Sequence, residues 1–382
     1  MNIILKDCNH SDLYPFTLSR PAAALRCGIF TMWEKWQFYF PSASISFLSQ
    51  DYLSEKFPTR LTADNYFIDG SIFPTHTLEK AILHLESDAC LVKGAQFIAA
   101  RCSHAEDLST LKKIQFNGEL DFIASPPDIF LKNDAQIRAD FALANSGKQS
   151  IQIDGTNQLI GAEAIFVEEG ARVSCSIINA TTGPVYISKN AEVMEGCMIR
   201  GPFALGENAV LKMGAKIYGA TTIGPGCKVG GEVSNAVFLS NSNKAHDGFI
   251  GNAVIGEWCN LGADTNCSNL KNNYGEVKIY HPQSKSYVST GLQFCGLLMA
   301  DHCKSAINTQ FNTGTVTGFS ANIFSGDFPR KYVPNFAWGD GTGNNKFDLA
   351  KAIQLAKTVM QRRGIAFSSG DEKIFNHLYN LD

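Results

Sequence analysis

The sequence predicts an α/β domain followed by a left-handed parallel β-helix of hexapeptide repeats, and two observations lead to this prediction. The first is that residues 187–229 carry an aliphatic residue at every sixth position, mostly with a small residue two places earlier. These residues are Ile187, Val193, Ile199, Leu205, Leu211, Ile217, Ile223 and Val229. Because helices repeat every 3.6 residues and strands every 2, a six-residue step indicates a solenoid whose coils each hold three short strands. The second is that residues 1–150 lack this step and alternate strand-like with helix-like segments. An ordinary β-sandwich is the alternative for the repeat region.

The six-residue phase breaks at residues 231–248 and resumes at Phe249, Ile255 and Leu261. The interrupting segment reads GEVSNAVFLSNSNKAHDG, and we expect it to be a loop that leaves the solenoid because no coil pattern is visible in it. Loops on a rigid scaffold often carry function, so its one histidine, His246, is a candidate functional residue. A second excursion ending in a hairpin follows, and the repeat returns more weakly over residues 299–323.

The regions on either side of the repeat give a three-part division of the chain. We expect an α/β domain at 1–150, the solenoid at 151–345 and a helical tail at 346–382. The expected elements are strands at 2–5, 64–74 and 89–101 and helices at 21–40, 75–86 and 128–145. We expect the tail to cover the open end of the solenoid or to dock on a neighbouring subunit.

The composition excludes several classes of function. The chain has 382 residues, 45% hydrophobic and 18% charged, with a net charge of −3 and no basic tract, so nucleic acid is not an expected partner. No apolar run reaches the ~18 residues that span a membrane, and the N-terminus lacks a signal-peptide core. The eleven cysteines are scattered without a CxxC pair, which predicts free thiols in a reducing cytoplasm and no zinc.

Four short motifs follow one another in the second half of the chain: Lys244-Ala245-His246, then IGEWCNLGA at 255–263, Asn269-Leu270 and Glu276-Val277-Lys278. In order and spacing they resemble the bifunctional UDP-N-acetylglucosamine pyrophosphorylase and glucosamine-1-phosphate N-acetyltransferase family, in its shorter branch. The N-terminal segment LYPFTLSRP at 13–21 is similar to part of the sugar-nucleotidyltransferase signature. This implies a divergent, truncated, Rossmann-like nucleotidyltransferase domain. The glycine-rich phosphate loop of that family is replaced by LKDCNH at 5–10.

The resemblance implies acetyl transfer from acetyl-CoA to an amino-sugar 1-phosphate, with His246 as general base. An imidazole suits this role because its pKa lies near neutral pH. By the same resemblance Asn269 would bind the acetyl group or amine, Asn260 would line the sugar pocket, and Lys244 and Lys278 would hold the sugar phosphate. Each of these also reads as an ordinary turn asparagine or solvated lysine.

Further candidates carry alternatives of their own. Phe249 stands where the family has tyrosine, and a phenyl ring cannot donate a hydrogen bond. His302, on a later coil, could be structural. Arg20 could face a phosphate or form a salt bridge, and the same choice holds for Arg26. Asp7, Asp64 and Asp69 are candidate Mg²⁺ ligands or surface aspartates.

The resemblance further implies a cytoplasmic homotrimer whose sites are shared between subunits and whose ligands are nucleotides and amino-sugar phosphates. Two other functions stay open. One is a Mg²⁺-dependent sugar-1-phosphate nucleotidyltransferase that transfers a uridylyl or thymidylyl group. The other is a non-catalytic trimeric protein that binds nucleotide sugars.

Overall fold

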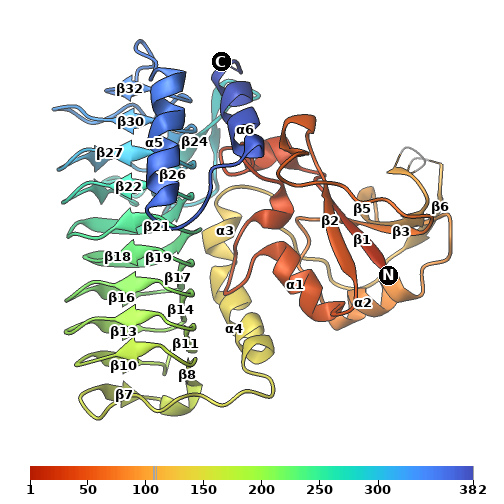
Figure 1. Cartoon of the computed structure of the whole chain (residues 1–382), viewed down its shortest axis with the longest axis horizontal. Coiled ribbons are helices and arrows are strands. Elements are labelled where there is room, and N and C mark those ends of the chain that lie inside the picture. The colour runs from red at the N-terminus through yellow and green to blue at the C-terminus, as the bar shows by residue number, and fades with distance from the viewer. Residues whose placement is uncertain (106–107, 109, 382) are drawn as a thin grey trace.

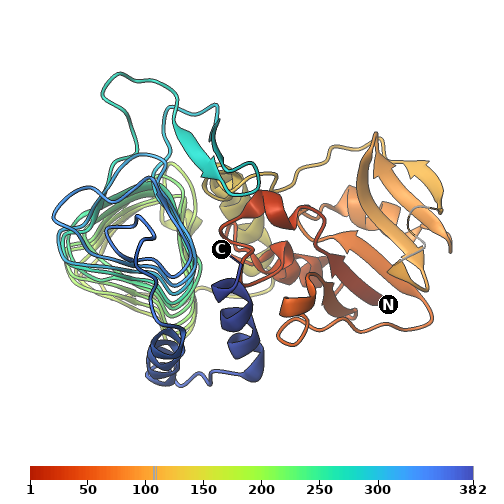
Figure 2. The ribbon, with the colours of Figure 1, turned by 90° about the horizontal axis from the view of Figure 1, so that it is seen from above.

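The computed structural model describes residues 1–105, 108 and 110–381 and contains two bodies that lie side by side (Figures 1 and 2). One is an α/β domain at the N-terminus, and the other is a parallel β-helix. Within the described residues, no helix combines the length and apolar character needed to cross a membrane.

The N-terminal domain is built on a six-stranded sheet with the order β2-β1-β3-β5-β4-β6. The strands are β1 Asn2–Lys6, β2 Ser44–Leu48, β3 Asn65–Asp69, β4 Ala89–Lys93, β5 Gln96–Cys102 and β6 Lys112–Gln115. Strand β1 runs parallel to both β2 and β3, whereas β5 is antiparallel to β3 and β4. The predicted α/β class is therefore confirmed, with a mixed sheet.

Helices α1 (Met32–Tyr39) and α2 (His76–Leu83) contribute to the core on one face of this sheet. Their buried residues Trp36 and Ile82 pack with Ile3 of β1. Helix α1 is shorter than the expected 21–40. It begins only after a capping box in which Thr31 and Glu34 bond each other's backbone amides. The residues before it form the short 3-10 helix η2 (Ala22–Ala24) and irregular backbone.

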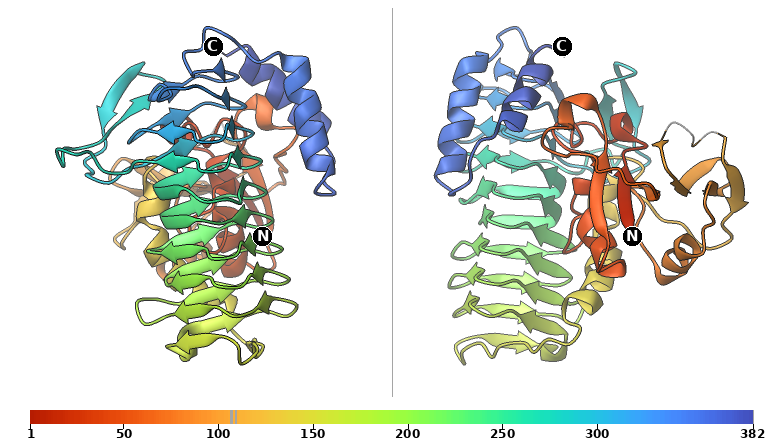
Figure 3. Two further views of the ribbon diagram at one scale, coloured as in Figure 1. Left: turned by 90° about the vertical axis from the view of Figure 1, so that its left-hand side faces the viewer. Right: turned by 45° about the vertical axis from the view of Figure 1, so that its right-hand side comes forward.

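The solenoid is a three-sided prism whose parallel strands stack coil on coil (Figure 3). Face A contains β7 Gln158–Ile160, β10 Ile177–Asn179, β13 Met198–Arg200, β16 Lys216–Tyr218, the first parts of β19 Glu232–Phe238 and β21 Phe249–Ile255, and then β23 Asn266–Cys267 and β28 Gln310–Phe311. Face B contains β8 Ile165–Val167, β11 Val185–Ile187, β14 Phe203–Leu205, β17 Thr221–Ile223, the second parts of β19 and β21, β26 Leu298–Met299, β29 Val316–Thr317 and β31 Tyr332–Val333. Face C contains β9 Arg172–Val173, β12 Glu192–Val193, β15 Val210–Leu211, β18 Lys228–Val229, β20 Asn243–Lys244, β22 Asn260–Leu261, β27 Lys304–Ser305, β30 Asn322–Ile323 and β32 Trp338–Gly339.

The hexad positions form the interior of this prism, as the sequence predicts. All eight aliphatic residues of the 187–229 series are at most 2% exposed and belong to one continuous core. A β-sandwich is therefore ruled out for this region.

The expectation of a projecting loop at 231–248 is wrong, because this segment is a complete coil that contains both β19 and β20. Leu211 pairs with Val229, but Val229 pairs with Lys244, so the coil is three residues shorter than the one before it. The shortening shifts the sequence phase without breaking the strand ladder. It also puts Ile250, rather than Phe249, opposite the buried Val233.

Face B is covered by the rest of the chain. The linker forms helices α3 (Asp128–Leu131) and α4 (Asn133–Ala144), and Ile137 of α4 packs on Phe166 and Tyr186. Higher on the same face, apolar residues of the N-terminal domain and α3 pack on outward side chains of the solenoid. These outward side chains are Val237, Leu239, Val254, Leu298 and Val316.

The excursion after β23 ends in an antiparallel hairpin, β24 (Lys278–His281) with β25 (Ser286–Ser289), as expected. The tail forms helices α5 (Leu349–Gln361) and α6 (Ser369–Tyr379), which lie along the side of the molecule's own solenoid rather than over its end (Figures 1 and 3). Phe375 of α6 packs against Phe319 of the solenoid and Leu53 of the N-terminal domain. The tail therefore joins the two bodies.

Candidate functional site

The groove that contains His246 lies on the edge where face C turns into face A. It measures about 700 Å³ and crosses several coils. Its lining residues are Met194, Lys212, Met213, Gly231, Ala245, His246, Asp247, Ala263, Asp264 and Asn308. We call it the His246 groove.

Two glycines lie beside this groove, and one of them, Gly231, lines it. Gly230 and Gly231 occupy the coil between Lys212 and His246, and a side chain on either would collide with the next coil. A Cβ on Gly230 would lie 2.6 Å from the Ala245 carbonyl oxygen and 3.0 Å from Lys212 Cβ. Gly231 has a φ of +70°, which disfavours any other residue. The absence of side chains at both positions lets the neighbouring coils approach closely beneath the turn that carries His246.

His246 itself is exposed and follows directly on β20. Among the residues that the structure describes, none forms a hydrogen bond with its ring. Lys212 and Asp247 line the same groove. Both ring nitrogens are therefore available to a substrate, with one cation, Lys212, and two carboxylates, Asp247 and Asp264, in the same groove.

Lys244 does not reach the groove surface, although the motif resemblance predicts a phosphate contact. It occupies the inward position opposite Val229 and is 1% exposed. Its Nζ donates to the carbonyl oxygens of Gly230 (3.0 Å), His246 (2.7 Å) and Asp247 (3.1 Å). The ammonium is therefore already occupied by the backbone around the histidine.

Asn269 and Phe249 meet in a second pocket, on the edge between faces A and B. This Asn269 pocket measures about 630 Å³ and also contains Asn235 and Asn252. The Asn269 amide donates to Asn252 Oδ1 at 2.8 Å. Face A therefore has the His246 groove along one edge and the Asn269 pocket along the other.

The other two predicted polar residues of the solenoid half lie apart from both pockets' linings. Asn260 is exposed on face C, 3.4 Å from the Asn243 amide. Lys278 is exposed on the hairpin strand β24. His302 is buried between Trp258, Phe319 and Phe375, and burial lowers its pKa well below the ordinary value. It is a structural residue of the tail interface.

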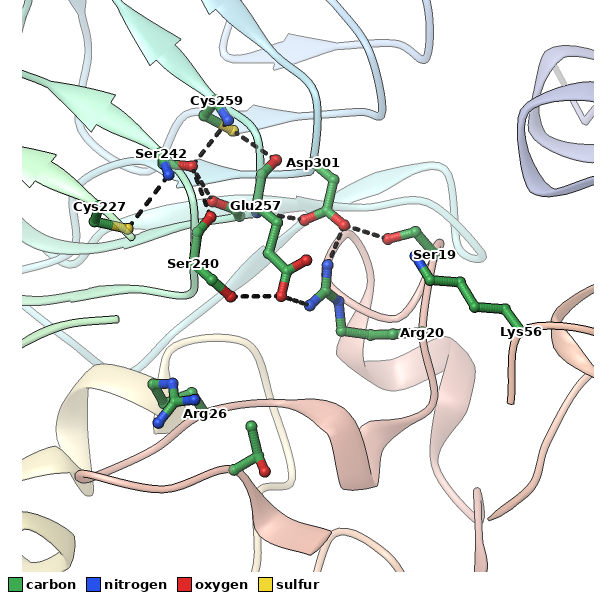
Figure 4. Close-up of polar contacts among 12 residues, drawn as sticks. Ser19, Arg20, Arg26, Lys56, Cys227, Ser240, Ser242, Glu257, Cys259 and Asp301 are labelled. Atoms are coloured by element: carbon green, nitrogen blue, oxygen red, sulfur yellow. Dashed lines mark hydrogen bonds and ion pairs between the residues drawn. The ribbon is translucent and has the colours of Figure 1, made fainter. Parts of the chain in front are cut away.

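Arg20 lies in the interface between the two bodies, where it forms a buried ionic cluster (Figure 4). Its Nη1 donates to Glu257 Oε1 at 2.7 Å, and its Nη2 donates to Asp301 Oδ2. Ser19 also donates to Asp301, and Ser240 donates to Glu257 at 2.7 Å. The predicted alternative of a salt bridge therefore describes Arg20, and its guanidinium holds the N-terminal domain to two coils of the solenoid.

The electrostatics of this cluster favour its charged form. Burial alone would raise the pKa of Glu257, but the adjacent Arg20 outweighs burial and lowers it to about 2. Burial acts against the charge of Arg20, and the Asp301 and Glu257 carboxylates raise its pKa in spite of that. Arg26 is likewise engaged, with Nη1 bonded to the Ile29 carbonyl and Nη2 3.6 Å from Glu34.

The candidate Mg²⁺ ligands lie at the ends of neighbouring parallel strands, since Asp7 follows β1 and Asp69 ends β3. The Asp7 side chain is 0% exposed and already contacts the His10 ring, the Ser49 hydroxyl and the Ala22 amide. Asp69 accepts two hydrogen bonds from Ser71, and burial raises its pKa. Mg²⁺ requires open oxygen ligands in octahedral geometry. These two carboxylates do not fit such a site.

Two observations complete the test for a metal ion. Asp64 pairs with Arg101 instead, at 2.8 Å. Over the described residues, no group of three or more histidine, cysteine, aspartate or glutamate side chains could hold a metal ion.

Sequence reasoning missed Lys212 and Asn252, which line the two pockets. Lys212 directly follows the inward Leu211, and Asn252 has a positive φ of 46° at a coil corner. Asn235, Asn252 and Asn269 recur at equal spacing in the sequence. That spacing was the available signal, but it is hidden until the shortened coil is placed in register.

Comparison with known proteins gives one family match and several relatives of low identity. Residues 2–149 match the family described as sugar nucleotidyl transferase. The chain is 29% identical over 150 residues to a bifunctional sugar-1-phosphate nucleotidylyltransferase/acetyltransferase of Sulfurisphaera tokodaii, covering 38% of this chain and 36% of that protein. It is 25% identical over 196 residues to the bifunctional protein GlmU of Synechococcus elongatus, covering 49% and 39%. The chain thus spans about two fifths of the length of these relatives.

Two solved structures are similar to part of the chain. One is a UDP-N-acetylglucosamine acyltransferase from Arabidopsis, with 14% identity, a TM-score of 0.25 and coverage of 56% of this chain and 80% of that one. The other is LpxA, a UDP-N-acetylglucosamine acyltransferase from Bacteroides fragilis, with 13% identity, a TM-score of 0.26 and coverage of 60% and 97%. By sequence, the chain is similar to bifunctional sugar-1-phosphate nucleotidylyltransferase/acetyltransferase proteins, and its residues 2–149 match the sugar nucleotidyl transferase family.

Proposed function

We propose that the protein transfers an acetyl group from acetyl-CoA to the amine of an amino-sugar 1-phosphate, with His246 as general base. The observation that carries this proposal is the His246 groove itself. Within the described part of the chain its imidazole forms no hydrogen bond, and it shares an open space of about 700 Å³ with Lys212 on a hexapeptide solenoid. The relatives that join a sugar nucleotidyltransferase to an acetyltransferase support the choice of an amino-sugar phosphate as acceptor.

The reaction requires few groups from the protein. The sugar amine must lose a proton to attack the thioester carbonyl, and the neutral imidazole of His246 accepts it. The new C–N bond forms as the C–S bond breaks, and the protonated imidazole returns a proton to the departing CoA thiolate. Lys212 lies in the same groove and supplies a cation for phosphate. The exposed side chain of Met213 offers an apolar surface for the pantetheine chain.

Assembly into a homotrimer would complete the site. Face B is covered by the chain itself, whereas face A exposes the apolar side chains of Ile177, Met198 and Tyr218. On the adjoining edge, Met213 and Ile307 are each 69% exposed. In a cyclic trimer the His246 groove of one subunit can face the Asn269 pocket of the next. The amides of that pocket would then bind the acetyl group beside the base.

One assay tests the proposal. The purified protein is given glucosamine-1-phosphate, acetyl-CoA, UTP and Mg²⁺, and free thiol and pyrophosphate are scored separately. We expect thiol release that depends on the amino sugar. Thiol release at the rate of the no-enzyme control, with every amino-sugar phosphate of a panel, would refute acetyl transfer.

The pyrophosphate reading tests the second candidate function, which is sugar-1-phosphate nucleotidyl transfer. The family match over residues 2–149 favours it. Against it stand the engaged side chains of Asp7 and Arg20 and the lack of glycine at residues 5–10. We expect no pyrophosphate above background. Ligand binding without thiol or pyrophosphate release would instead indicate a non-catalytic protein that binds nucleotide sugars.

A further inference from the structure

We propose that Lys244 is a positioning residue for the His246 groove, acting from inside the solenoid on the backbone that carries the histidine. The inference rests on the proposed function of His246 and assigns Lys244 a different role from the phosphate contact that its motif suggests. It starts from the position of this side chain in the coil.

Lys244 stands where the repeat places an aliphatic residue. Strand β20 lies between β18 and β22 on face C, and Lys244 pairs with the buried Val229. A lysine stem can fill that place, but its ammonium must also be accommodated away from water, which is costly unless acceptors compensate. Burial lowers the pKa of Lys244 to about 8, although Asp247 and Asp264 act in the opposite direction.

The three acceptors of the ammonium show what this arrangement does. Two are the carbonyl oxygens of His246 and Asp247, and the third is that of Gly230 on the preceding coil. Three hydrogen bonds use all the protons of an ammonium. They tie the turn that carries His246 to the coil beneath it, and hydrogen bonds from a charged donor are stronger than those from a neutral one. The turn is thereby held in one conformation.

The glycines beside this turn fit the same purpose. A Cβ on Gly231 would lie 2.9 Å from Lys244 Nζ and 2.9 Å from Asp247 Cα. The lack of a side chain at Gly231 therefore leaves space for the ammonium. Fixing a general base in place is worth a large factor in rate, because a displacement of about 1 Å can cost about a hundredfold.

Lys244→Met tests the inference, because methionine keeps the stem and removes the ammonium. We expect kcat for thiol release to fall about ten- to a hundredfold while KM changes little. An unbranched apolar side chain suits the inward position, so the thermal midpoint should stay close to that of the wild type. Lys304→Met is the matched control: Lys304 also donates to two backbone carbonyls, of Trp258 and His302, but on the edge between faces B and C. The kcat of the Lys304→Met variant should equal that of the wild type.

A double variant separates positioning from a general structural role. If Lys244 acts through His246, Lys244→Met should slow the His246→Ala enzyme no further. Equal factors in both backgrounds, or a wild-type kcat for Lys244→Met, would overturn the inference. Should Lys244→Met fail to fold, Lys244→Leu decides, because it restores an aliphatic residue at the inward position: kcat should fall while KM changes little, and an unchanged kcat would overturn the inference. If His246→Ala itself keeps full activity, the proposed function fails first.

Discussion

Replacing His246 with alanine is expected to lower kcat for thiol release by about 10²–10⁴-fold, the contribution typical of a general base. Among the described residues, no other histidine lines the His246 groove. KM for acetyl-CoA should change much less, because the groove walls remain. The measurement is the initial rate of thiol release at saturating amino-sugar phosphate.

His84→Ala is the matched control for this variant. His84 is also exposed, but it lies in the N-terminal domain at the end of α2, where its Nδ1 contacts the Lys80 carbonyl. It should keep the wild-type rate. A His246→Ala enzyme that also keeps the wild-type rate would remove the base from the mechanism and leave the groove without a chemical role.

Arg20→Met is expected to destabilise the protein by about 3–5 kcal/mol, because it leaves the Glu257 and Asp301 carboxylates buried without a partner. The first unfolding transition in urea should move to lower concentration, since the cluster joins the two bodies. Arg172→Met is the control, because Arg172 pairs with Glu192 at 3.1 Å within the solenoid and its side chain is 70% exposed. Exposed pairs are worth about 0–1 kcal/mol. Equal effects of the two variants would show that the interface does not depend on this cluster.

The same cluster predicts that the stability of the folded protein falls at acidic pH. The pKa of Glu257 is lowered from 4.5 to about 2 in the folded protein, so folding favours the ionised form. Its contribution to stability is complete above pH 4.5 and is lost as the pH falls toward 2. In Arg20→Met the partner is missing, so the unfolding transition should vary less with pH in this window.

Parts of the fold that depend on residues close together in the sequence could be predicted, and parts that depend on distant residues could not. The hexad repeat predicts the solenoid because each inward residue is fixed by its own coil and the next. The coil at 231–248 escaped detection because strand pairing needs aligned inward residues, not coils of equal length. Its inward residues are Val233, Phe238 and Lys244, and a buried lysine does not read as part of a hydrophobic repeat.

The candidate site shows the same limit. His246 was predicted because its motif is contiguous in sequence. Arg20 pairs with Glu257 and Asp301, which lie far from it in the sequence, on two coils of the solenoid. No local sequence pattern predicts such a pairing. The docking of the N-terminal domain did leave a signal. Strands of face B such as residues 236–238 are apolar on both sides. This indicates that one side faces the solenoid core and that another part of the protein covers the other side.

The most direct test of the account is complementation between two inactive variants. His246→Ala and Asn269→Ala, carrying different tags, are co-expressed, and oligomers that hold both chains are isolated and assayed for thiol release. If the His246 groove of one subunit faces the Asn269 pocket of the next, mixed oligomers contain some intact sites and should be more active than either variant alone. Mixed oligomers no faster than the better single variant would contradict a site shared between subunits.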